Sequence, residues 1–328
     1  MSQVVRWGAI GSGWIAHMFA NTMRAVKDSE ILGIADSSRE MAEKYQKEFS
    51  IPRVFASPLE LVESPDIDAV YVATPHCFHK QYIELALSHG KHVLCVKPIT
   101  INAGELEEMI ALARSNNLLL MEAMWTRFKP EFLAARRALR DGVIGSVERL
   151  EMHCSFQPPY NPESRLFNRA LGGGSLLDVG VYVANLAHFF MGESPTAIKG
   201  FSHIGPTGVD HTTSAVLGYS NGAAAFITSS ITSDARQDIK IIGTKGVIRI
   251  NGFWYSDSYE LALYGQEPQV FRFPDSKSDQ VEKHDFMLEA FNACLRAGRT
   301  ENDIIPIGET LAVSKTMDEI LRQAGIKY

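Results

Sequence analysis

The sequence predicts an α/β protein of two domains, and three observations support this fold class. The 328 residues are too many for one ordinary hydrophobic core and suit two domains. Up to about residue 124, short β-prone runs alternate with helical segments, which is typical of a doubly wound parallel sheet. Beyond it, strands with one apolar side follow one another across turns, which predicts an α+β domain on a large, mostly antiparallel open sheet. We expect the domains at 1–124 and 125–328.

The chain begins with a strand, a glycine turn and a helix. Residues 4–10 are β-prone, and Gly11, Gly13 and Ala16 then fit the pattern G-x-G-x-x-A. The first glycine permits a tight turn, the second lets backbone approach a pyrophosphate, and the small third residue lets helix and strand pack closely. The helix N-terminus would present free N–H groups to the phosphates. With a second strand at the right distance, the motif predicts a Rossmann dinucleotide-binding domain.

The second strand, 30–36, ends at Asp36. An acidic residue there typically accepts hydrogen bonds from the adenosine ribose, and its charge repels a 2′-phosphate. Asp36 therefore favours NAD slightly. Ser37, Ser38 and Arg39 would suit NADP if Asp36 turned away, although Ser37 or Ser38 is also suited to cap the following helix. The cofactor is predicted as NAD(P).

Three further strands, each followed by chemistry-bearing residues, complete the first domain. The expected strands are 69–75, 91–96 and 118–125, with helices at 39–49, 79–90 and 103–117 between or before them. Ligands of such sheets bind outside the carboxyl ends of strands. The residues at these ends are Thr74, Pro75, Lys97, Pro98 and Glu122.

The second domain alternates in hydrophobicity. In the run 146–156, Leu150, Met152, Cys154 and Phe156 share one side. Further strands are expected at 197–203, 212–219, 222–230, 238–244, 246–252 and 260–265, and helices at 284–299 and 308–325. The polar side of the sheet is either an oligomer contact or a solvated face.

An apolar helix from Gly172 to Gly192 carries a narrow polar stripe. Asp178, Tyr182 and Asn185 are spaced i, i+4 and i+7, which places them on one helix face. Ser175 and Asp178 fit a capping box loosely, but capping does not explain the two polar residues further along. Buried polar groups cost free energy unless they are paired. The stripe is therefore expected to line a cleft, over the apolar face of the sheet.

Composition excludes several classes of function. The net charge is −6, and no basic stripe indicates nucleic acid binding. No apolar run approaches the roughly 20 residues of a membrane span, and the N-terminal residues do not resemble a signal peptide. The four scattered cysteines are interpreted as free thiols in a reducing compartment, which predicts a cytoplasmic protein. The spacing of His76 and His79 alone does not indicate a metal site, and none is expected.

The motifs together resemble the Gfo/Idh/MocA oxidoreductases over essentially the whole chain, and most resemble the dihydrodiol and xylose dehydrogenase branch of that family. The resemblance rests on "GSGWIA", "VATPHCFHKQYIELALSHGKHVLCVKP", "MEAMWTRFKPEF", "GGGSLLDVGVY" and "IPIGETLAVSKTMDEILRQAGIKY". It implies a catalytic group of Lys97, Asp178 and Tyr182. The usual E-K-P motif is altered, because Val96 replaces the glutamate, and this departure puts the orientation of the lysine in doubt. The resemblance also suggests a cis peptide before Pro98.

The implied chemistry is hydride transfer between C4 of the nicotinamide and a secondary hydroxyl or carbonyl. A phenol ionises near pH 10, and an adjacent ammonium lowers that pKa toward working pH. Either Lys97 or Tyr182 would be the proton donor, and Asp178 would orient the lysine or the substrate. The expected cofactor contacts are Gly11, Ser12, Gly13, Trp14, Ile15, Ala16, Asp36, Ser37, Arg39, Thr74, Pro75, His79, Lys97, Trp125 and Arg127. Trp125 and Arg127 are equally suited to packing, and His79 to an ordinary loop role.

The expected function is an NAD(P)-dependent oxidoreductase for a sugar, cyclic polyol or dihydrodiol, acting as a homodimer. Two alternatives stay open. One is a dinucleotide-binding regulator or scaffold without turnover, to which Val96 gives some weight. The other is an enzyme that reduces a flat tetrapyrrole in a wide cleft.

Overall fold

The computed structural model describes residues 4–235, 237–274 and 284–328. Their contacts divide them into two compact units. The first unit contains the described residues up to Trp125 together with 284–308, and the second contains the rest. The division falls one residue after the expected boundary, whereas residues 284–308 pack with the first unit although the sequence had assigned them to the second.

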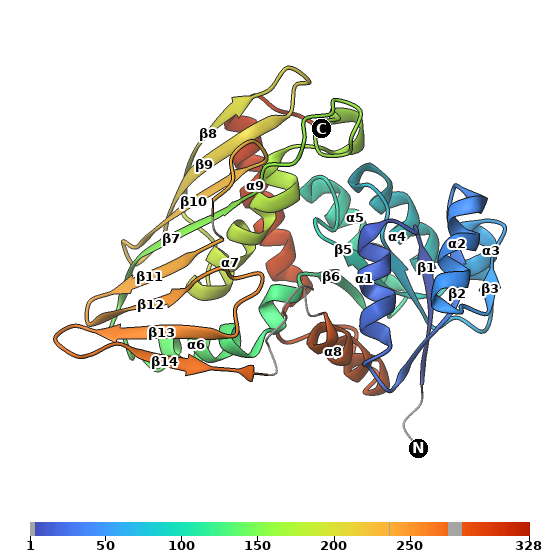
Figure 1. The fold of residues 1–328 in the computed structure, drawn as a ribbon, viewed down its shortest axis with the longest axis horizontal. Helices are drawn as coiled ribbons and strands as arrows, with labels where there is room; N and C mark the ends of the chain where they lie inside the picture. The colour runs from blue at the N-terminus through green and yellow to red at the C-terminus, as the bar shows by residue number, and fades with distance from the viewer. Residues whose placement is uncertain (1–3, 236, 275–283) are drawn as a thin grey trace. The chain divides into compact units, whose positions relative to one another are not determined.

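The first unit is built on a six-stranded parallel sheet with strand order β3-β2-β1-β4-β5-β6 (Figure 1). This order confirms the doubly wound prediction. The strands are β1 (Val5–Ile10), β2 (Ser29–Ala35), β3 (Arg53–Val54), β4 (Ala69–Val72), β5 (His92–Val96) and β6 (Leu120–Ala123). The helices are α1 (Trp14–Met23), α2 (Arg39–Phe49), α3 (Pro58–Glu63), α4 (His79–Ser88), α5 (Ala103–Ser115) and α8 (Asp285–Arg296). The short β3 and α3 were not expected from the sequence.

Helix α8 comes from far along the chain and completes the core of the first unit. Phe291 packs its ring 4.9 Å from that of Trp7, a fully buried residue of β1. At the edge of the helix, Asn292 donates to the hydroxyl of Ser29 and Arg296 pairs with Asp28 at 3.0 Å. The first unit is therefore discontinuous in sequence.

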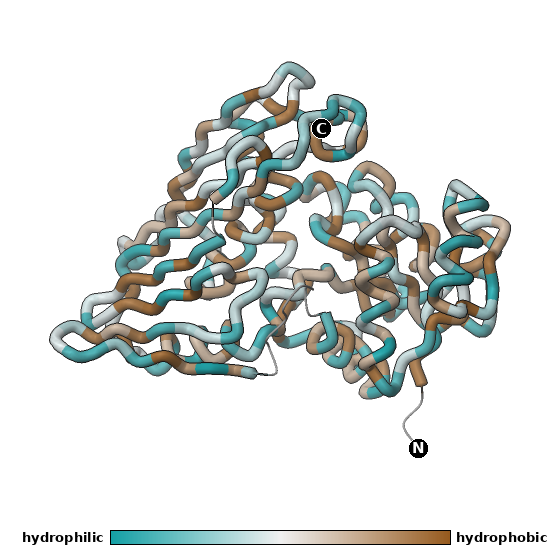
Figure 2. The backbone as a smooth tube through the Cα atoms, viewed as in Figure 1, coloured by the Kyte–Doolittle hydropathy of each residue, from teal (hydrophilic) through white to brown (hydrophobic). Residues whose placement is uncertain are grey.

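The second unit is built on an eight-stranded sheet in the order β14-β13-β12-β11-β7-β10-β9-β8 (Figure 1). Among the strands that the structure describes in this sheet, only the β7–β10 pair is parallel, as expected of a mostly antiparallel sheet. The strands are β7 (Val147–Ser155), β8 (Ala197–Ile204), β9 (Asp210–Gly218), β10 (Ala224–Ser230), β11 (Ile239–Gly243), β12 (Gly246–Ile250), β13 (Ser258–Leu263) and the unexpected β14 (Gln269–Arg272). The helices are α6 (Pro130–Arg140), α7 (Val181–Met191) and α9 (Ile307–Gln323). Hydrophilic and hydrophobic residues alternate along several strands (Figure 2).

The apolar face of this sheet is covered by the helix with the polar stripe. A π-helical turn, η4 (Leu176–Gly180), leads into α7, and together they pack on β7, β9 and β10. Gly180 permits the close approach, because a Cβ there would lie 2.9 Å from the hydroxyl oxygen of Ser229.

The expectation that no apolar run reaches membrane-span length is wrong. Within the described residues, the helical stretch Arg169–Met191 has the length and apolar composition of a span. Its most apolar window is 89% buried inside the structure, as for the core helix of a globular unit.

Candidate functional site

The glycine loop of the first unit has the geometry that the motif requires. Gly11 has φ +98°, and a Cβ there would lie 2.5 Å from the carbonyl oxygen of Ala73. No atom of the described residues lies within 4 Å of a Cβ built on Gly13, which precedes the first turn of α1. Ala16 is fully buried and its carbonyl accepts a 2.7 Å hydrogen bond from Tyr45 of α2. Helix α1 begins at Trp14, directly after Gly13, so its positive dipole end lies at the glycine loop, where the motif places a pyrophosphate. Trp14 is 67% exposed.

Asp36 is engaged by the glycine loop itself, which the sequence did not predict. One carboxylate oxygen accepts from both the amide and the hydroxyl of Ser12, each at 2.7 Å. The other accepts from the amide of Ser38 at 2.8 Å and the hydroxyl of Ser37 at 3.3 Å. The carboxylate therefore ties the end of β2 to the loop between β1 and α1, and Ser12 serves as its anchor.

Of the residues after Asp36, Ser38 caps helix α2 and Arg39 forms an ion pair on the surface of that helix. Ser38 caps α2 by accepting from the amide of Met41, which settles the choice between Ser37 and Ser38. The exposed guanidinium of Arg39 pairs with Glu43 at 2.7 Å.

His79 connects the loops that follow β4 and β5. It is fully buried, and its ring nitrogens lie 2.8 Å from the carbonyl oxygens of Pro98 and Thr74. Burial lowers the pKa of His79, and the two carbonyl contacts oppose this shift. Because both nitrogens contact backbone, the geometry gives His79 a structural role beside Lys97 and leaves no ring nitrogen for a cofactor.

Lys97 follows β5 and is partly exposed, and the Lys97–Pro98 peptide is cis, as the resemblance suggested. Val96, which replaces the motif carboxylate, is buried. A carboxylate is nevertheless close in the sheet, because Glu122 of β6 lies opposite Cys95 and accepts from the amide of Ile99 at 3.1 Å. Glu122 thus holds the backbone just beyond Lys97.

In the second unit, the capping-box interpretation of Ser175 and Asp178 is wrong. The Ser175 hydroxyl donates instead to Asp210 at 2.6 Å. Asp210 also accepts from the amide of Leu176 at 2.7 Å, so a residue of β9 caps this helix. Burial raises the pKa of Asp210. Asp178 is thereby left for another role.

Asp178 is 3% exposed and pairs with Arg165 at 2.7 Å. Arg165 lies in the irregular segment before the three glycines, and half of its side chain is exposed. A Cβ on Gly173 would lie 2.6 Å from the carbonyl oxygen of Leu166 and 2.8 Å from that of Arg165. The glycine therefore lets this segment fold onto the helix start, which brings Arg165 to Asp178.

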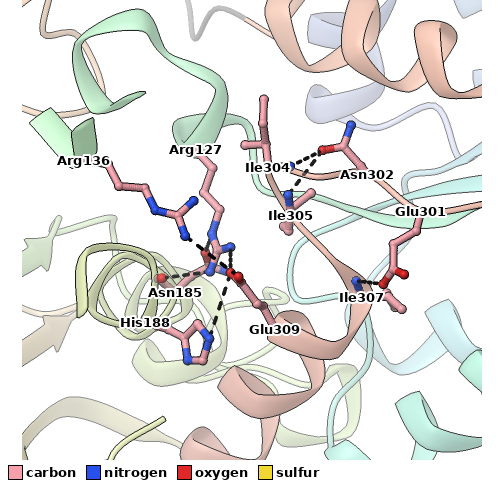
Figure 3. Close-up of polar contacts among 10 residues, drawn as sticks. All are labelled: Arg127, Arg136, Asn185, His188, Glu301, Asn302, Ile304, Ile305, Ile307 and Glu309. Carbon is pink, nitrogen blue, oxygen red and sulfur yellow. Dashed lines mark hydrogen bonds and ion pairs between the residues drawn. The ribbon is translucent and has the colours of Figure 1, made fainter. Parts of the chain in front are cut away.

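The three residues of the polar stripe contact different neighbours. Tyr182 is almost fully buried, with its ring centroid 6.3 Å from that of Phe253 and 5.7 Å from that of Trp254. Asn185 instead accepts from Nε of Arg127, whose Nη1 pairs with Glu309 at 2.5 Å (Figure 3).

Arg127 and Trp125 are both buried, and the partners described here belong to the same unit as each of them. Arg127 has no exposed surface and joins Arg136 and His188 around Glu309 (Figure 3). Trp125 is 2% exposed, with its ring 5.4 Å from that of His284. Both geometries fit the packing alternative, and the cofactor contacts expected of these two residues stay a prediction. Sequence reasoning did not identify Arg165, the partner of Asp178, or Asp210, the partner of Ser175. Neither residue lies in a recognisable local sequence pattern.

The fold and the glycine loop define a dinucleotide-binding protein, and the family profiles that match it are those of oxidoreductases. The profile "Oxidoreductase family, NAD-binding Rossmann fold" matches residues 5–124, and the GFO/IDH/MocA C-terminal domain matches residues 132–249. The chain belongs to the Gfo/Idh/MocA oxidoreductase family.

Relatives and solved structures cover nearly the whole chain. Trans-1,2-dihydrobenzene-1,2-diol dehydrogenase from Mus musculus is 34% identical over 99% of this chain and 98% of its own length. The Xenopus laevis protein of that name is 33% identical over 98% of this chain and 99% of its own length. Aldose-aldose oxidoreductase from Caulobacter crescentus, solved with glycerol, has a TM-score of 0.89, 25% identity and 98% coverage of both chains. A 3-ketoreductase from Actinomadura kijaniata, solved with NADP and TDP-benzene, has a TM-score of 0.86, 25% identity and the same coverage.

Proposed function

We propose that this enzyme transfers hydride between the nicotinamide and a secondary hydroxyl or carbonyl of a sugar, cyclic polyol or dihydrodiol. Support comes from relatives named for a dihydrodiol and from a solved structure named for aldoses. Lys97, Asp178 and Tyr182 act together on the substrate oxygen and its proton. The bound cofactor supplies or accepts the hydride at C4. Within the protein, Lys97 and Tyr182 hold and move the proton, and Asp178 orients the oxygen or the lysine.

The observation that carries this proposal is the buried carboxylate of Asp178. A buried carboxylate and its ion pair cost free energy on folding. Here it lies in a mostly apolar helix, four residues before a phenol, and the capping role is already filled by Asp210. A part in the chemistry explains why the helix keeps both groups.

The test is a substrate screen with isotope tracing. NAD and NADP are offered with aldoses, inositols and trans-dihydrodiols, and the reduced cofactors with diketones, while cofactor absorbance is followed. A substrate deuterated at its carbinol carbon should deliver deuterium to C4 of the nicotinamide, which NMR of the product detects. Tight cofactor binding without turnover on any compound would favour the regulator alternative instead.

Cofactor binding is proposed to depend on Asp36 in two ways, through a ribose contact that selects NAD and through the loop anchor at Ser12 that serves both cofactors. Asp36→Ala should weaken NAD binding more than NADP binding, because only the ribose contact discriminates between them. Ser12→Ala is the matched control, since it removes the hydroxyl anchor and should affect both cofactors equally. Identical ratios of the two dissociation constants in the two variants would show that Asp36 is an anchor only.

The assembly is proposed to be a dimer formed through the outer face of the eight-stranded sheet. Val216 and Phe226 lie opposite each other on β9 and β10, and both are exposed. Phe201 of β8 is 76% exposed and lies opposite Ser214, on the same face, so the three side chains form an exposed apolar patch of the kind that marks an interaction surface. We also propose a cytoplasmic location. The four cysteines are free thiols, which suits a reducing compartment.

A further inference from the structure

The segment between Arg127 and Phe132 contains an ion pair that the proposed chemistry does not use. Lys129 is 1% exposed and Glu131 has no exposed surface, and their charged atoms lie 2.9 Å apart. Lys129 precedes the first turn of α6, where Pro130 and Glu131 suit a helix start. Removing two charges from water costs several kcal/mol per ion unless further hydrogen bonds compensate. The compensation comes from one loop.

That loop, residues 253–256 between β12 and β13, wraps around the ammonium group. Lys129 donates to the carbonyl oxygens of Phe253 at 3.0 Å, Trp254 at 3.3 Å and Ser256 at 2.9 Å. The Ser256 hydroxyl lies 3.3 Å from the ammonium and donates to Glu131 at 2.8 Å. Three N–H groups are thus shared among five oxygen atoms. We name this arrangement, of Lys129, Glu131 and residues 253–256, the ammonium cage.

The ammonium cage determines the position of two aromatic side chains next to Tyr182. Phe253 and Trp254 contribute their carbonyls to Lys129 and their rings to the surroundings of Tyr182. The loop begins with a separate anchor, because the amide of Phe253 donates to the carbonyl of Gln237 at 2.7 Å. Loss of the ammonium would therefore release the later part of the loop while the start stays attached.

We propose that Lys129 is a positioning residue, whose ammonium fixes the loop of Phe253 and Trp254 against Tyr182 and thereby places the phenol for proton transfer. The proposal rests on the role proposed above for Tyr182. The proposal requires a positive charge among the oxygen atoms of the ammonium cage. The aliphatic part of the Lys129 side chain only places the charge there.

Chemical rescue tests that requirement. Lys129→Ala leaves a space bounded by the cage oxygens, into which ammonium ion fits and tetramethylammonium does not. The full-length enzyme is labelled with 5-fluorotryptophan, and the ¹⁹F resonance of Trp254 is assigned with Trp254→Phe. We expect kcat to fall between about tenfold and a hundredfold, the scale of a small misplacement of reacting groups, and the Trp254 resonance to move. Ammonium chloride should restore both, and equimolar sodium or tetramethylammonium chloride should not.

Lys80→Ala is the matched control, because Lys80 pairs with Glu108 at 2.6 Å on the surface of the other unit. Its kcat should not respond to ammonium. Two further variants serve if Lys129→Ala does not fold. Ser256→Ala removes one cage oxygen, and the double variant Lys129→Met/Glu131→Gln removes both charges. Each variant should move the Trp254 resonance. An unmoved resonance, or rescue by sodium as complete as by ammonium, would overturn the proposal. The resonance does not depend on turnover, so an active Tyr182→Phe enzyme would refute the proposed chemistry while leaving the effect of Lys129 on the loop measurable.

Discussion

Tyr182 is the residue on which the proposed chemistry depends most directly. Tyr182→Phe removes one hydroxyl and leaves the ring packed beside Phe253 and Trp254. Turnover should fall at least about a hundredfold, the usual size of an acid–base contribution, and cofactor affinity should stay. Lys97→Met, which keeps the side-chain length without the charge, should behave alike. Steady-state rates and cofactor titrations measure both effects.

The double variant Tyr182→Phe/Lys97→Met separates a joint role from two independent ones. If the phenol and the ammonium form one proton-transfer unit, the double variant should be little slower than either single variant. Multiplying rate losses would show that they act independently. A fully active Tyr182→Phe enzyme would end the claim that this helix carries the chemistry.

At the level of elements, Gly173 links the segment of Arg165 to the helix of Asp178. Gly173→Ala would place a Cβ against three backbone carbonyls, which cannot move like the end of a side chain. Such overpacking typically costs about 1–3 kcal/mol, and the loss of the Arg165–Asp178 contact should also lower kcat/KM. Thermal melting and steady-state kinetics measure the two effects.

Gly308→Ala provides the control for that comparison. A Cβ at Gly308, in α9, would meet no atom within 4 Å in the part of the chain that the structure describes. Alanine is also the better helix former, so this variant should melt at the same or a higher temperature. A Gly173→Ala protein as stable and active as Gly308→Ala would contradict the packing argument.

The cluster around Glu309 predicts acid sensitivity of α7. Burial, and then the charge of Arg127, lower the pKa of His188, with a further contribution from Arg136, while Glu309 opposes them. A histidine whose folded pKa lies below its unfolded value of about 6.5 binds more protons when unfolded. Its neutral form in the folded state is therefore stabilising above that pH, and stability is lost as the pH falls below it.

The measurement is the free energy of unfolding in urea between pH 5 and pH 8. His188→Gln should show a smaller loss of stability toward acid than the wild type, because glutamine does not titrate. Other buried histidines contribute equally to both proteins, so the difference isolates His188. Parallel pH profiles of the two proteins would show that protonation of His188 does not lower the free energy of unfolding, which would contradict the prediction.

The whole molecule is proposed to be a dimer, and one substitution tests it. Phe226→Glu introduces a charge opposite Val216 at the centre of the proposed contact, which should convert a dimer to a folded monomer at micromolar concentration. Leu59→Glu is the control, because Leu59 is similarly exposed but lies on α3 of the first unit. Sedimentation measures both, and a wild-type monomer would count against the dimer.

The elements that the sequence predicted are those with a long local signal. The buried strands of the first sheet and the alternating strands of the second are examples, as is the glycine motif. The two-residue β3 and the edge strand β14 were missed because elements this short carry no periodicity. The site was less predictable for another reason. Asp210 caps a helix 34 residues earlier, and Lys129 meets a loop 124 to 127 residues later. Such partners are brought together only by the tertiary fold.

Helix α8 also has a consequence for biosynthesis. A ribosome releases a chain from its N-terminus, and domains usually fold in that order. Here Trp7 is made early, but Phe291, which packs against it, emerges only after all eight described strands of the second sheet have been translated. The nascent dinucleotide unit must therefore wait, with one side of its core exposed, until residues 285–296 have been translated. The dinucleotide unit is the first to be translated, but its core is completed only when α8 is added. Until then, the apolar surface that α8 will cover depends on protection by other molecules, such as chaperones.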